Sequence, residues 1–346
     1  MTFMKGAPGC CCCKHFYTGS QAISMKLLNT KLVFDRHEEH PDDATFTVRA
    51  WCLDHYHNRL FVLGYNHGTN KLQTIAWCKA NLPIVRNDTV MHDLLTVGSS
   101  FNTGLMRICT ASEAEKIYYC VNDVPATTTY HFYELGFDGT GNVEVFSRTM
   151  SSASGSLVRR LEHCRHNDKL YYAATKSGDS VVKIYRCDRD GSNDQLVYDP
   201  GSVSINRSTC FAFDNVRGKL YVARQYLASS PYHGDIVRME LDGSSPTIVY
   251  DTGNYVSPHL FYAVQAVRFS HKDDRLLWIE GSSSVAATPD NANEPTAGLW
   301  TAAPDGSDPE LIVGHYQLDL SGPTAANASD IDFGCGYERL GSGTEA

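Results

Sequence analysis

The sequence contains 346 residues, of which 42% are hydrophobic and 20% are charged, and it is rich in Gly (27) and Tyr (19). This mixture favours strands and tight turns over helices, and the length fits one large all-β domain. The formal net charge of −9 argues against a phosphate-backbone ligand, because nucleic-acid binders gather Lys and Arg on one face. We therefore expect no nucleic-acid partner.

Targeting segments and cysteines narrow the class further. No apolar run approaches the roughly 18 residues that cross a bilayer, and residues 1–16 lack the apolar stretch of a secretory signal. We therefore expect no membrane span and synthesis in the cytoplasm. Seven of the 12 cysteines lie singly in strand-like segments, where we expect small buried hydrophobes: Cys52, Cys78, Cys109, Cys120, Cys164, Cys187 and Cys210.

The N-terminal region begins with a Cys-rich tail over residues 1–13. Three short strand patterns follow, at 15–18, 22–28 and 31–34. They precede the first copy of a repeat that organises the rest of the chain. We predict a single domain over residues 14–340 and a C-terminal tail over 341–346.

The repeat is a polar turn, a basic residue and an aliphatic-aromatic strand. It occurs five times, as Asn58-Arg59-Leu60-Phe61-Val62, Glu115-Lys116-Ile117-Tyr118-Tyr119, Asp168-Lys169-Leu170-Tyr171-Tyr172, Gly218-Lys219-Leu220-Tyr221-Val222 and Asp274-Arg275-Leu276-Leu277-Trp278. The middle residues, which we call the anchors, are separated by 57, 53, 50 and 56 residues. That spacing is typical of one four-stranded propeller blade.

Each period contains further strands and one turn. A strand pattern precedes the anchor, and an alternating strand, an Asp-Gly turn and a short β-branched strand follow it. Asp-Gly between strands predicts a hairpin because Gly tolerates a positive φ. The turns are Asp138-Gly139, Asp190-Gly191-Ser192, Asp242-Gly243-Ser244 and Asp305-Gly306.

The C-terminal segment 329–333 has the pattern of a first strand, but the chain ends before further strands of that blade. The three N-terminal strand patterns supply what is missing. We therefore predict an all-β fold: a six-bladed β-propeller of four-stranded antiparallel blades, the last blade closed by N-terminal strands that pair with the C-terminal strand.

Over roughly residues 14–340 the repeat resembles the YWTD, or low-density-lipoprotein-receptor class B, family of six-bladed propellers. The residues that carry the resemblance are Tyr171, Tyr221, Trp278, Asp332 and the turn Asp242-Gly243-Ser244. The resemblance implies a rigid disc that presents one face or its central mouth to a protein or peptide partner.

The run Cys10, Cys11, Cys12 and Cys13 has no place in the repeat, and the predicted closure brings it close to Cys335. Clustered thiolates suit a structural Zn²⁺, and a disulfide to Cys335 would equally clasp the closure. Intermolecular disulfides, lipid attachment and incidental tail thiols are the other hypotheses. We expect no other cofactor.

Charged residues recur on the predicted first strands: Arg49, Arg107, Arg160, Glu162, Arg268, Asp330 and Asp332. One interpretation is a hydrated channel lined by paired charges. A sharper hypothesis is an anion or an acidic peptide terminus at the channel mouth, because guanidinium groups bind carboxylates in a bidentate way.

The motifs of zincins, serine hydrolases and nucleotide binders are absent from the sequence. Histidines such as His55, His57, His163 and His166 are assigned to solvated turns. We therefore expect no enzyme but a binding or assembly scaffold, as an adaptor or as a component of a larger particle such as a virion or cell-surface appendage. The alternative is a metal-dependent hydrolase of the six-bladed lactonase type. Segments 79–104, 223–235, 281–297 and 314–328 are predicted inserts that form the partner surface.

Overall fold

The computed structural model describes residues 16–18, 21–23, 46–54, 59–66, 71–78, 90–96, 106–122, 128–151, 158–205, 210–226, 233–253, 262–271, 273–282, 298–314 and 331–333. Apart from one 3₁₀ turn, η4 (Ser112–Ala114), the regular elements in these ranges are strands. None of the described helical residues forms a segment long and apolar enough to cross a membrane.

The strands are, in chain order, β1 (Phe16–Thr18), β2 (Gln21–Ile23), β3 (Phe46–Asp54), β4 (Arg59–Asn66), β5 (Lys71–Cys78), β6 (Val90–Thr96), β7 (Arg107–Ala111), β8 (Lys116–Asn122), β9 (Thr129–Gly136), β10 (Val143–Thr149), β11 (Arg160–Cys164), β12 (Lys169–Ala174), β13 (Lys183–Cys187), β14 (Gln195–Tyr198), β15 (Phe211–Asp214), β16 (Lys219–Tyr226), β17 (His233–Glu240), β18 (Thr247–Asp251), β19 (Tyr262–Ser270), β20 (Arg275–Ser282), β21 (Gly298–Ala302), β22 (Glu310–Gly314) and β23 (Ile331–Phe333).

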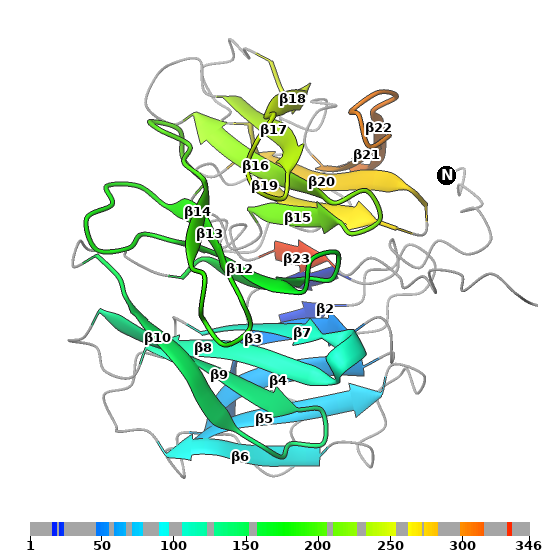
Figure 1. The fold of residues 1–346 in the computed structure, drawn as a ribbon. Coiled ribbons are helices and arrows are strands. Elements are labelled where there is room, and N and C mark those ends of the chain that lie inside the picture. Colours follow the sequence, from blue (N-terminus) through cyan, green and yellow to red (C-terminus); the bar gives the residue numbers. More distant parts are fainter. Residues whose placement is uncertain are drawn as a thin grey trace, which may run out of the picture.

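These strands form six antiparallel sheets (Figure 1). Five of them contain four strands in chain order, and we call them blades 1 to 5: β3–β6, β7–β10, β11–β14, β15–β18 and β19–β22. The first strands of neighbouring blades lie against one another, as β3 does with β7 and β7 with β11, so the first strand of each blade is the inner one. The prediction of an all-β propeller with one blade per repeat is confirmed.

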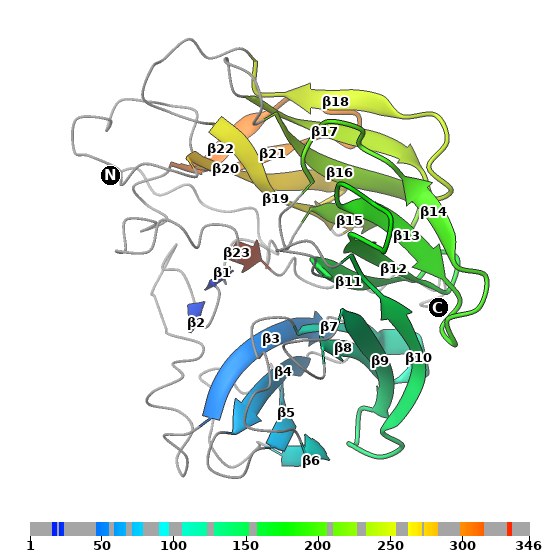
Figure 2. The same cartoon turned by 90° about the vertical axis from the view of Figure 1, so that its left-hand side faces the viewer.

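The sixth sheet combines the two ends of the chain in the order β2-β1-β23. Tyr17 in β1 lies opposite Asp332 in β23 on one side and Ala22 in β2 on the other. This sheet lies between blades 5 and 1 (Figure 2), and β23 contacts β19 of blade 5. One N-terminal strand, β1, thus pairs with the C-terminal strand β23, whereas the predicted strand at 31–34 lies outside the described residues.

Two of the predicted inserts, 79–104 and 223–235, are wrong in their bounds because they contain strand residues. Segment 79–104 contains β6, the fourth strand of blade 1, which pairs with β5 from Val90 to Thr96. Segment 223–235 belongs largely to the hairpin of β16 and β17, in which Tyr226 lies opposite His233. The sequence reasoning missed β6 because its polar residues His92 and Asp93 interrupt the hydrophobic alternation, and it ended the pattern of β16 at Val222, before the end of the strand at Tyr226.

In blades 2 and 3 the second strand is the most deeply buried. In β12 the residues from Leu170 to Ala174 are all fully buried, because blades pack against both faces of this strand. Such a strand needs apolar or aromatic side chains on both sides, which explains why the repeat reads as a continuous apolar run. The described thiols of Cys109, Cys120, Cys164, Cys187 and Cys210 are buried and outside any disulfide, as predicted.

A β-bulge recurs at one position in the outer strand of blades 1 to 5. The residue that each register shift leaves unpaired is aliphatic in every case: Leu94, Val145, Val197, Val249 and Ile312. Bulges bend a strand and interrupt its free edge, so these positions protect the outer edges from pairing with other chains.

The Asp-Gly turns pack directly on these bulges. A β-carbon at Gly243, in the turn of blade 4, would lie 1.8 Å from the carbonyl oxygen of Val197, the bulge residue of blade 3. At Gly306 it would lie 1.7 Å from the carbonyl oxygen of Val249. Both glycines also have a positive φ, of 87° and 84°. The turn therefore requires Gly for its backbone angle and for the contact between blades.

Candidate functional site

The predicted charged residues of the inner strands fall into two layers. Arg107 and Arg160 occupy equivalent positions, each the first residue of its inner strand and each opposite the third residue after the anchor. Glu162 and Arg268 form a second layer, each opposite the residue that follows the anchor. These inner strands therefore carry three arginines and one glutamate in two layers near the ring axis.

The guanidinium groups of the first layer have specific partners. Arg107 donates from Nε to the backbone carbonyl of Arg159 in blade 3, at 2.7 Å, and so links blades 2 and 3. Arg160 forms an ion pair with Glu162, two residues along the same strand, with Nη2 and Oε2 2.6 Å apart. Two of the listed charged residues, Arg160 and Glu162, thus form an ion pair, and Arg107 binds the backbone of the neighbouring blade.

In the second layer, Arg268 is the enclosed residue. Arg268 is 9% exposed and donates to the carbonyl oxygen of Val267 at 3.1 Å. The Cys210 thiol lies within the electrostatic reach of Arg160 and Arg268, but burial dominates and raises its pKa to about 12. Such a thiol stays protonated and unreactive at neutral pH. No thiolate at Cys210 therefore offsets the positive charge of Arg160 and Arg268.

Of the other predicted site residues, two lie in described strands and the rest lie outside the described residues. Arg49 is the unpaired residue of a bulge in β3, between Val48 and Ala50, and Asp332 lies in β23 opposite Tyr17. Asp330, the cysteine run from Cys10 to Cys13, and Cys335 lie outside the described residues. The zinc and disulfide hypotheses and the carboxylate set of the hydrolase hypothesis therefore stay predictions.

The turns between first and second strands form a chain of polar links from blade to blade. Arg165 in blade 3 donates to Glu113 in blade 2 at 2.6 Å. The side-chain oxygen of Asn215 in blade 4 accepts the backbone N–H of Arg165 at 3.0 Å. Arg217 in blade 4 binds Asp274 in blade 5 through two contacts of 2.6 Å. These turns therefore act as connectors between blades.

The assignment of His163 to a solvated turn is wrong. It belongs to β11, its side chain is 8% exposed, and its Nε2 lies 2.9 Å from the Asp168 carboxylate. Burial lowers the pKa of His163 against the opposing effect of Asp168, which favours the neutral imidazole. His166 does lie in the turn, with Nδ1 3.0 Å from the Asn215 carbonyl oxygen. Across the described ranges, no three His, Cys, Asp or Glu side chains are grouped so as to hold a metal ion.

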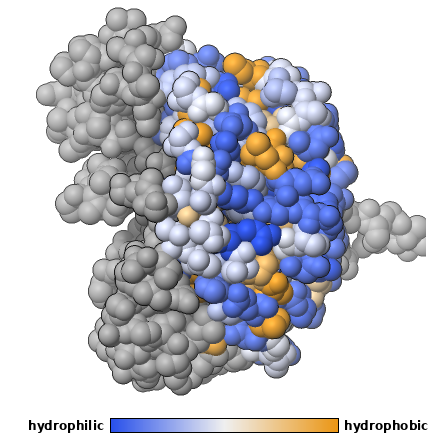
Figure 3. Space-filling model, turned by 60° about the vertical axis from the view of Figure 1, so that its left-hand side comes forward, coloured by the Kyte–Doolittle hydropathy of each residue, from blue (hydrophilic) through white to orange (hydrophobic). Residues whose placement is uncertain are grey.

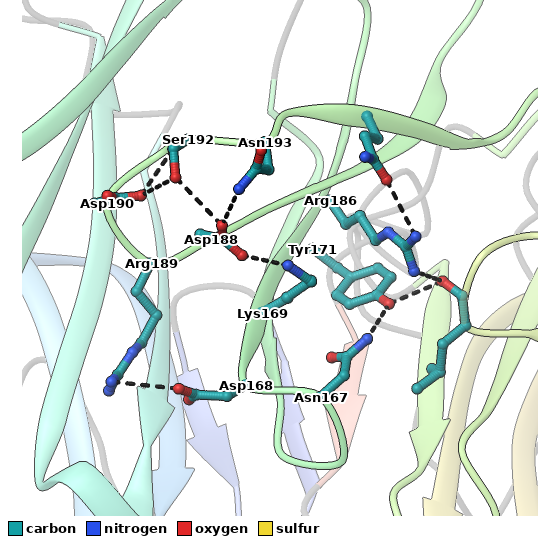
Figure 4. Close-up of polar contacts among 12 residues, drawn as sticks. Asn167, Asp168, Lys169, Tyr171, Arg186, Asp188, Arg189, Asp190, Ser192 and Asn193 are labelled. Carbon is teal, nitrogen blue, oxygen red and sulfur yellow. Dashed lines mark hydrogen bonds and ion pairs between the residues drawn. The ribbon is translucent and has the colours of Figure 1, made fainter.

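Two residues that carry the YWTD resemblance, Tyr171 and Tyr221, form contacts between blades, and Figure 4 shows those of Tyr171. Tyr171 and Arg186 lie opposite each other in blade 3, and both donate to the carbonyl oxygen of Leu241 in blade 4, at 2.9 and 3.0 Å. Leu241 precedes the Asp242-Gly243 turn. In the same way Tyr221 donates to the carbonyl oxygen of Pro304, which precedes the Asp-Gly turn of blade 5, at 2.9 Å.

One buried acid was not identified from the sequence. Glu280 in β20 is 1% exposed, and its Oε1 accepts hydrogen bonds from the Tyr250 hydroxyl at 2.5 Å and from Trp278 Nε1 at 2.9 Å. Burial raises the pKa of Glu280 to about 7, against the smaller lowering effect of the two donors. A signal was available, because Glu280 is in phase with the buried Leu276 and Trp278.

Exposed apolar residues offer a second surface to consider. Val143, Leu196 and Ile248 lie on the outer strands of three successive blades and are each about half exposed, at 52%, 50% and 52%. On the face drawn in Figure 3, the hydrophobic patches are separate and the surroundings are mostly hydrophilic. Single exposed aliphatic residues are common on protein surfaces. The two charged layers of the inner strands are therefore the better candidate site.

No protein-family model and no curated protein matches the sequence. Among solved structures, a chain from the crystal structure of a nidogen/laminin complex aligns at 10% identity with a TM-score of 0.51, over 88% of this chain and 94% of that chain. Putative TolB from Agrobacterium tumefaciens aligns at 13% identity with a TM-score of 0.49, over 86% of each chain. The β-propeller domain of the Trilobed protease from Pyrococcus furiosus aligns at 11% identity with a TM-score of 0.46, over 77% of this chain and 71% of that domain.

The first of these alignments spans nearly the whole of both chains, so the two share a fold. At 10% identity the likeness extends to the fold alone. Propellers serve many unrelated functions, and a function has to be argued from the site.

Proposed function

We propose that this chain is a non-enzymatic binding module that holds an acidic protein segment at the arginine-bearing end of its inner strands. The observation that carries the proposal is a reversal of charge. The chain has a formal net charge of −9, whereas the inner strands of blades 2, 3 and 5 carry Arg107, Arg160 and Arg268 against Glu162. A positive site on an acidic protein attracts an anionic segment, while the rest of the surface repels copies of the protein itself.

The geometry of the first layer supports a carboxylate ligand. Arg107 and Arg160 begin the inner strands of adjacent blades, and the contact from Arg107 to the Arg159 carbonyl brings those two strand starts together. Two neighbouring guanidinium groups bind carboxylates through paired, charge-assisted hydrogen bonds. Glu162, whose side chain is 26% exposed, is the competitor that an incoming carboxylate would displace from Arg160.

The rigidity of the scaffold supports binding rather than a moving catalytic assembly. The hydroxyl groups of Tyr171 and Tyr221 and the side chain of Asn215 each join one blade to the next. A scaffold that is already rigid loses little conformational entropy when it binds, so more of the interaction energy appears as affinity.

We also propose that the chain is a divergent relative of the YWTD propellers. The support is the coupling of two signature features, because the tyrosine after the anchor of one blade donates to the residue before the Asp-Gly turn of the next, for Tyr171 with Leu241 and Tyr221 with Pro304. The tyrosine and the Asp-Gly turn, which are separate features in the sequence, are therefore in contact in the structure.

The proposal is tested with a fluorescein-labelled oligoglutamate peptide and fluorescence anisotropy. Native protein should bind the peptide, and the affinity should fall as salt is raised, because the contacts are ionic. Arg107→Ala combined with Arg160→Ala should weaken binding by about tenfold or more, since both charge-assisted contacts are lost. Glu162→Gln should strengthen it, since the competitor of the incoming carboxylate loses its charge.

The matched control is Arg165→Ala combined with Arg189→Ala, which also removes two positive charges but from ion pairs in the turns, with Glu113 and Asp168. Its affinity should equal that of the native protein. The proposal fails if the native protein does not bind the peptide, or if both double variants bind it equally. A divalent cation retained by the native protein and lost in Asp332→Ala would favour the hydrolase alternative instead.

A further inference from the structure

The seam between blades 4 and 5 contains a buried carboxyl group that no part of the proposed binding site uses. Glu280 belongs to the second strand of blade 5, and its Oε1 accepts the hydroxyl hydrogen of Tyr250, which lies in the outer strand of blade 4. The indole of Trp278 donates to the same oxygen. One carboxyl oxygen therefore joins two blades through a phenol and an indole.

The surroundings of Glu280 are apolar. Its partners in register on the flanking strands are Val264 of β19 and Gly298 of β21. Trp278 stacks on Trp300 and packs against the ring of Tyr250. An ionised carboxylate in such a place loses most of its hydration, and neutral donors replace only part of it.

The charged groups on the packed strands of blade 4 are engaged with each other. Arg224 of β16 binds the Asp235 carboxylate of β17 through Nε and Nη2, at 2.7 and 2.5 Å, and Tyr226 donates to the same carboxylate at 3.0 Å. Asp251, next to Tyr250, is exposed. The groups that act on the pKa of Glu280 are burial first, which raises it, and then Tyr250 and Trp278, which lower it.

We propose that Glu280 is a proton-dependent clamp between blades 4 and 5: its ionised form holds Tyr250 and Trp278 together, and its protonation loosens this contact. The carboxylate accepts both hydrogen bonds as charge-assisted bonds, which are stronger than the neutral bonds that a protonated carboxyl accepts. Burial opposes the charge, so the group takes up a proton more readily than a carboxyl in water, and both hydrogen bonds then weaken. Tyr250 lies near the end of β18 and Glu280 near the end of β20, so loosening acts where the chain leaves both strands.

The fluorescence of Trp278 reports on the clamp directly because its indole contacts the titrating group. We expect the tryptophan emission of the native protein to change with a midpoint near pH 7, the pKa to which burial raises Glu280. Glu280→Gln, which keeps the shape and the acceptor oxygen, should abolish this transition and leave emission flat on both sides of that pH. The matched control Glu240→Gln removes an acid from β17 that pairs with Lys219 near the surface, and it should keep the transition.

A second variant separates a titrating clamp from a merely structural one. The Tyr250 hydroxyl favours the ionised form by donating to it, so Tyr250→Phe should move the midpoint to a higher pH while the amplitude persists. A structural role alone would leave the midpoint in place. The inference is overturned if native emission is flat across this range, if Glu280→Gln retains the transition, or if Tyr250→Phe leaves the midpoint unchanged.

Discussion

Two neighbouring seams of the propeller use different chemistry at equivalent positions. Between blades 3 and 4, Tyr171 and Arg186 both donate to the neutral carbonyl oxygen of Leu241 in the next blade. Between blades 2 and 3, the equivalent pair is Tyr118 and Glu134, and Tyr118 donates to the Glu134 carboxylate within its own blade, at 2.5 Å. The repeat therefore specifies where side chains meet, and two cross-strand residues decide which interaction forms.

The residue that precedes the Asp-Gly turn changes together with that pair. At the seam with Arg186, the turn belongs to blade 4 and is preceded by Leu241. At the seam with Glu134, the turn belongs to blade 3 and is preceded by Arg189. Arg189 exerts an electrostatic effect on both Tyr118 and Glu134. At the seam between blades 3 and 4 the tyrosine thus donates to a backbone acceptor that does not titrate, whereas at the seam between blades 2 and 3 it donates to a carboxylate that does.

Each of the two seams contains the glycine of an Asp-Gly turn, Gly191 or Gly243. The largest expected effect comes from replacing Gly243. Gly243→Ala would place a β-carbon 1.8 Å from the Val197 carbonyl oxygen, at a φ of 87°. The turn cannot move away without breaking its own hydrogen bonds, from the Gly243 N–H to the Glu240 carbonyl and from the Glu240 N–H to the Ser244 carbonyl. We therefore expect a loss of more than about 4 kcal/mol in the free energy of unfolding. Thermal and chemical denaturation would measure it.

Gly178→Ala is the matched control for this clash. Gly178 has a φ of 92°, but a β-carbon there would meet nothing within 4 Å. The substitution should therefore cost about 1 to 2 kcal/mol, the strain of a left-handed conformation alone. Equal losses for the two variants would show that packing on the bulge contributes nothing and that the backbone angle is the whole reason for Gly243.

This pair of glycines shows how far the sequence predicts the fold. The anchors and the Asp-Gly turns identified the blades, because their chemistry is local and repeats at one spacing. The contact of Gly243 with Val197 joins residues that are distant in sequence, so no local pattern could indicate it. The strand β6 was likewise missed, because the hydrophobic alternation that marks other strands is interrupted there.

The candidate site was predictable in part for a similar reason. Arg160 and Glu162 alternate along one strand, and the sequence alone placed them on the same side. Arg107 reaches a carbonyl in the next blade, a contact that depends on how blades pack. Glu280 went unnoticed because its strand was read as a buried apolar run, in which a single acid does not disturb the pattern.

A smaller effect is expected when the neutral seam loses its phenol hydroxyl. Tyr171→Phe removes a buried hydrogen bond to the Leu241 carbonyl while Arg186 continues to donate to it. We expect a loss of about 1 kcal/mol in the free energy of unfolding. Because the acceptor is a backbone carbonyl, which does not titrate, this loss should be the same in urea denaturation at acidic and at neutral pH. A loss that varied strongly over that range would contradict the account of this seam.

The smallest expected effect, and the one that separates the two seams, is that of Tyr118→Phe. Partial burial would raise the pKa of Glu134, but hydrogen bonds from Lys116 and Tyr118 outweigh it and hold the pKa below its ordinary value. A lowered pKa stabilises the fold above the ordinary value, and this contribution is lost as pH falls through the folded-state pKa. Tyr118→Phe should therefore cost about 0.5 kcal/mol at neutral pH, where Lys116 still neutralises Glu134, and less once the pH falls below the ordinary pKa of a glutamate.

The double variant Tyr118→Phe with Glu134→Gln decides whether the carboxylate is responsible. A neutral amide in place of the carboxylate leaves no charge to titrate. The cost of Tyr118→Phe measured in the Glu134→Gln background should therefore be the same at acidic and at neutral pH. If the pH dependence survives in that background, another acid near Tyr118 governs the seam between blades 2 and 3. If the pH dependence disappears, Glu134 is responsible for it. The two seams then differ in the residue that lies opposite the tyrosine, which is the titrating Glu134 in blade 2 and Arg186 in blade 3.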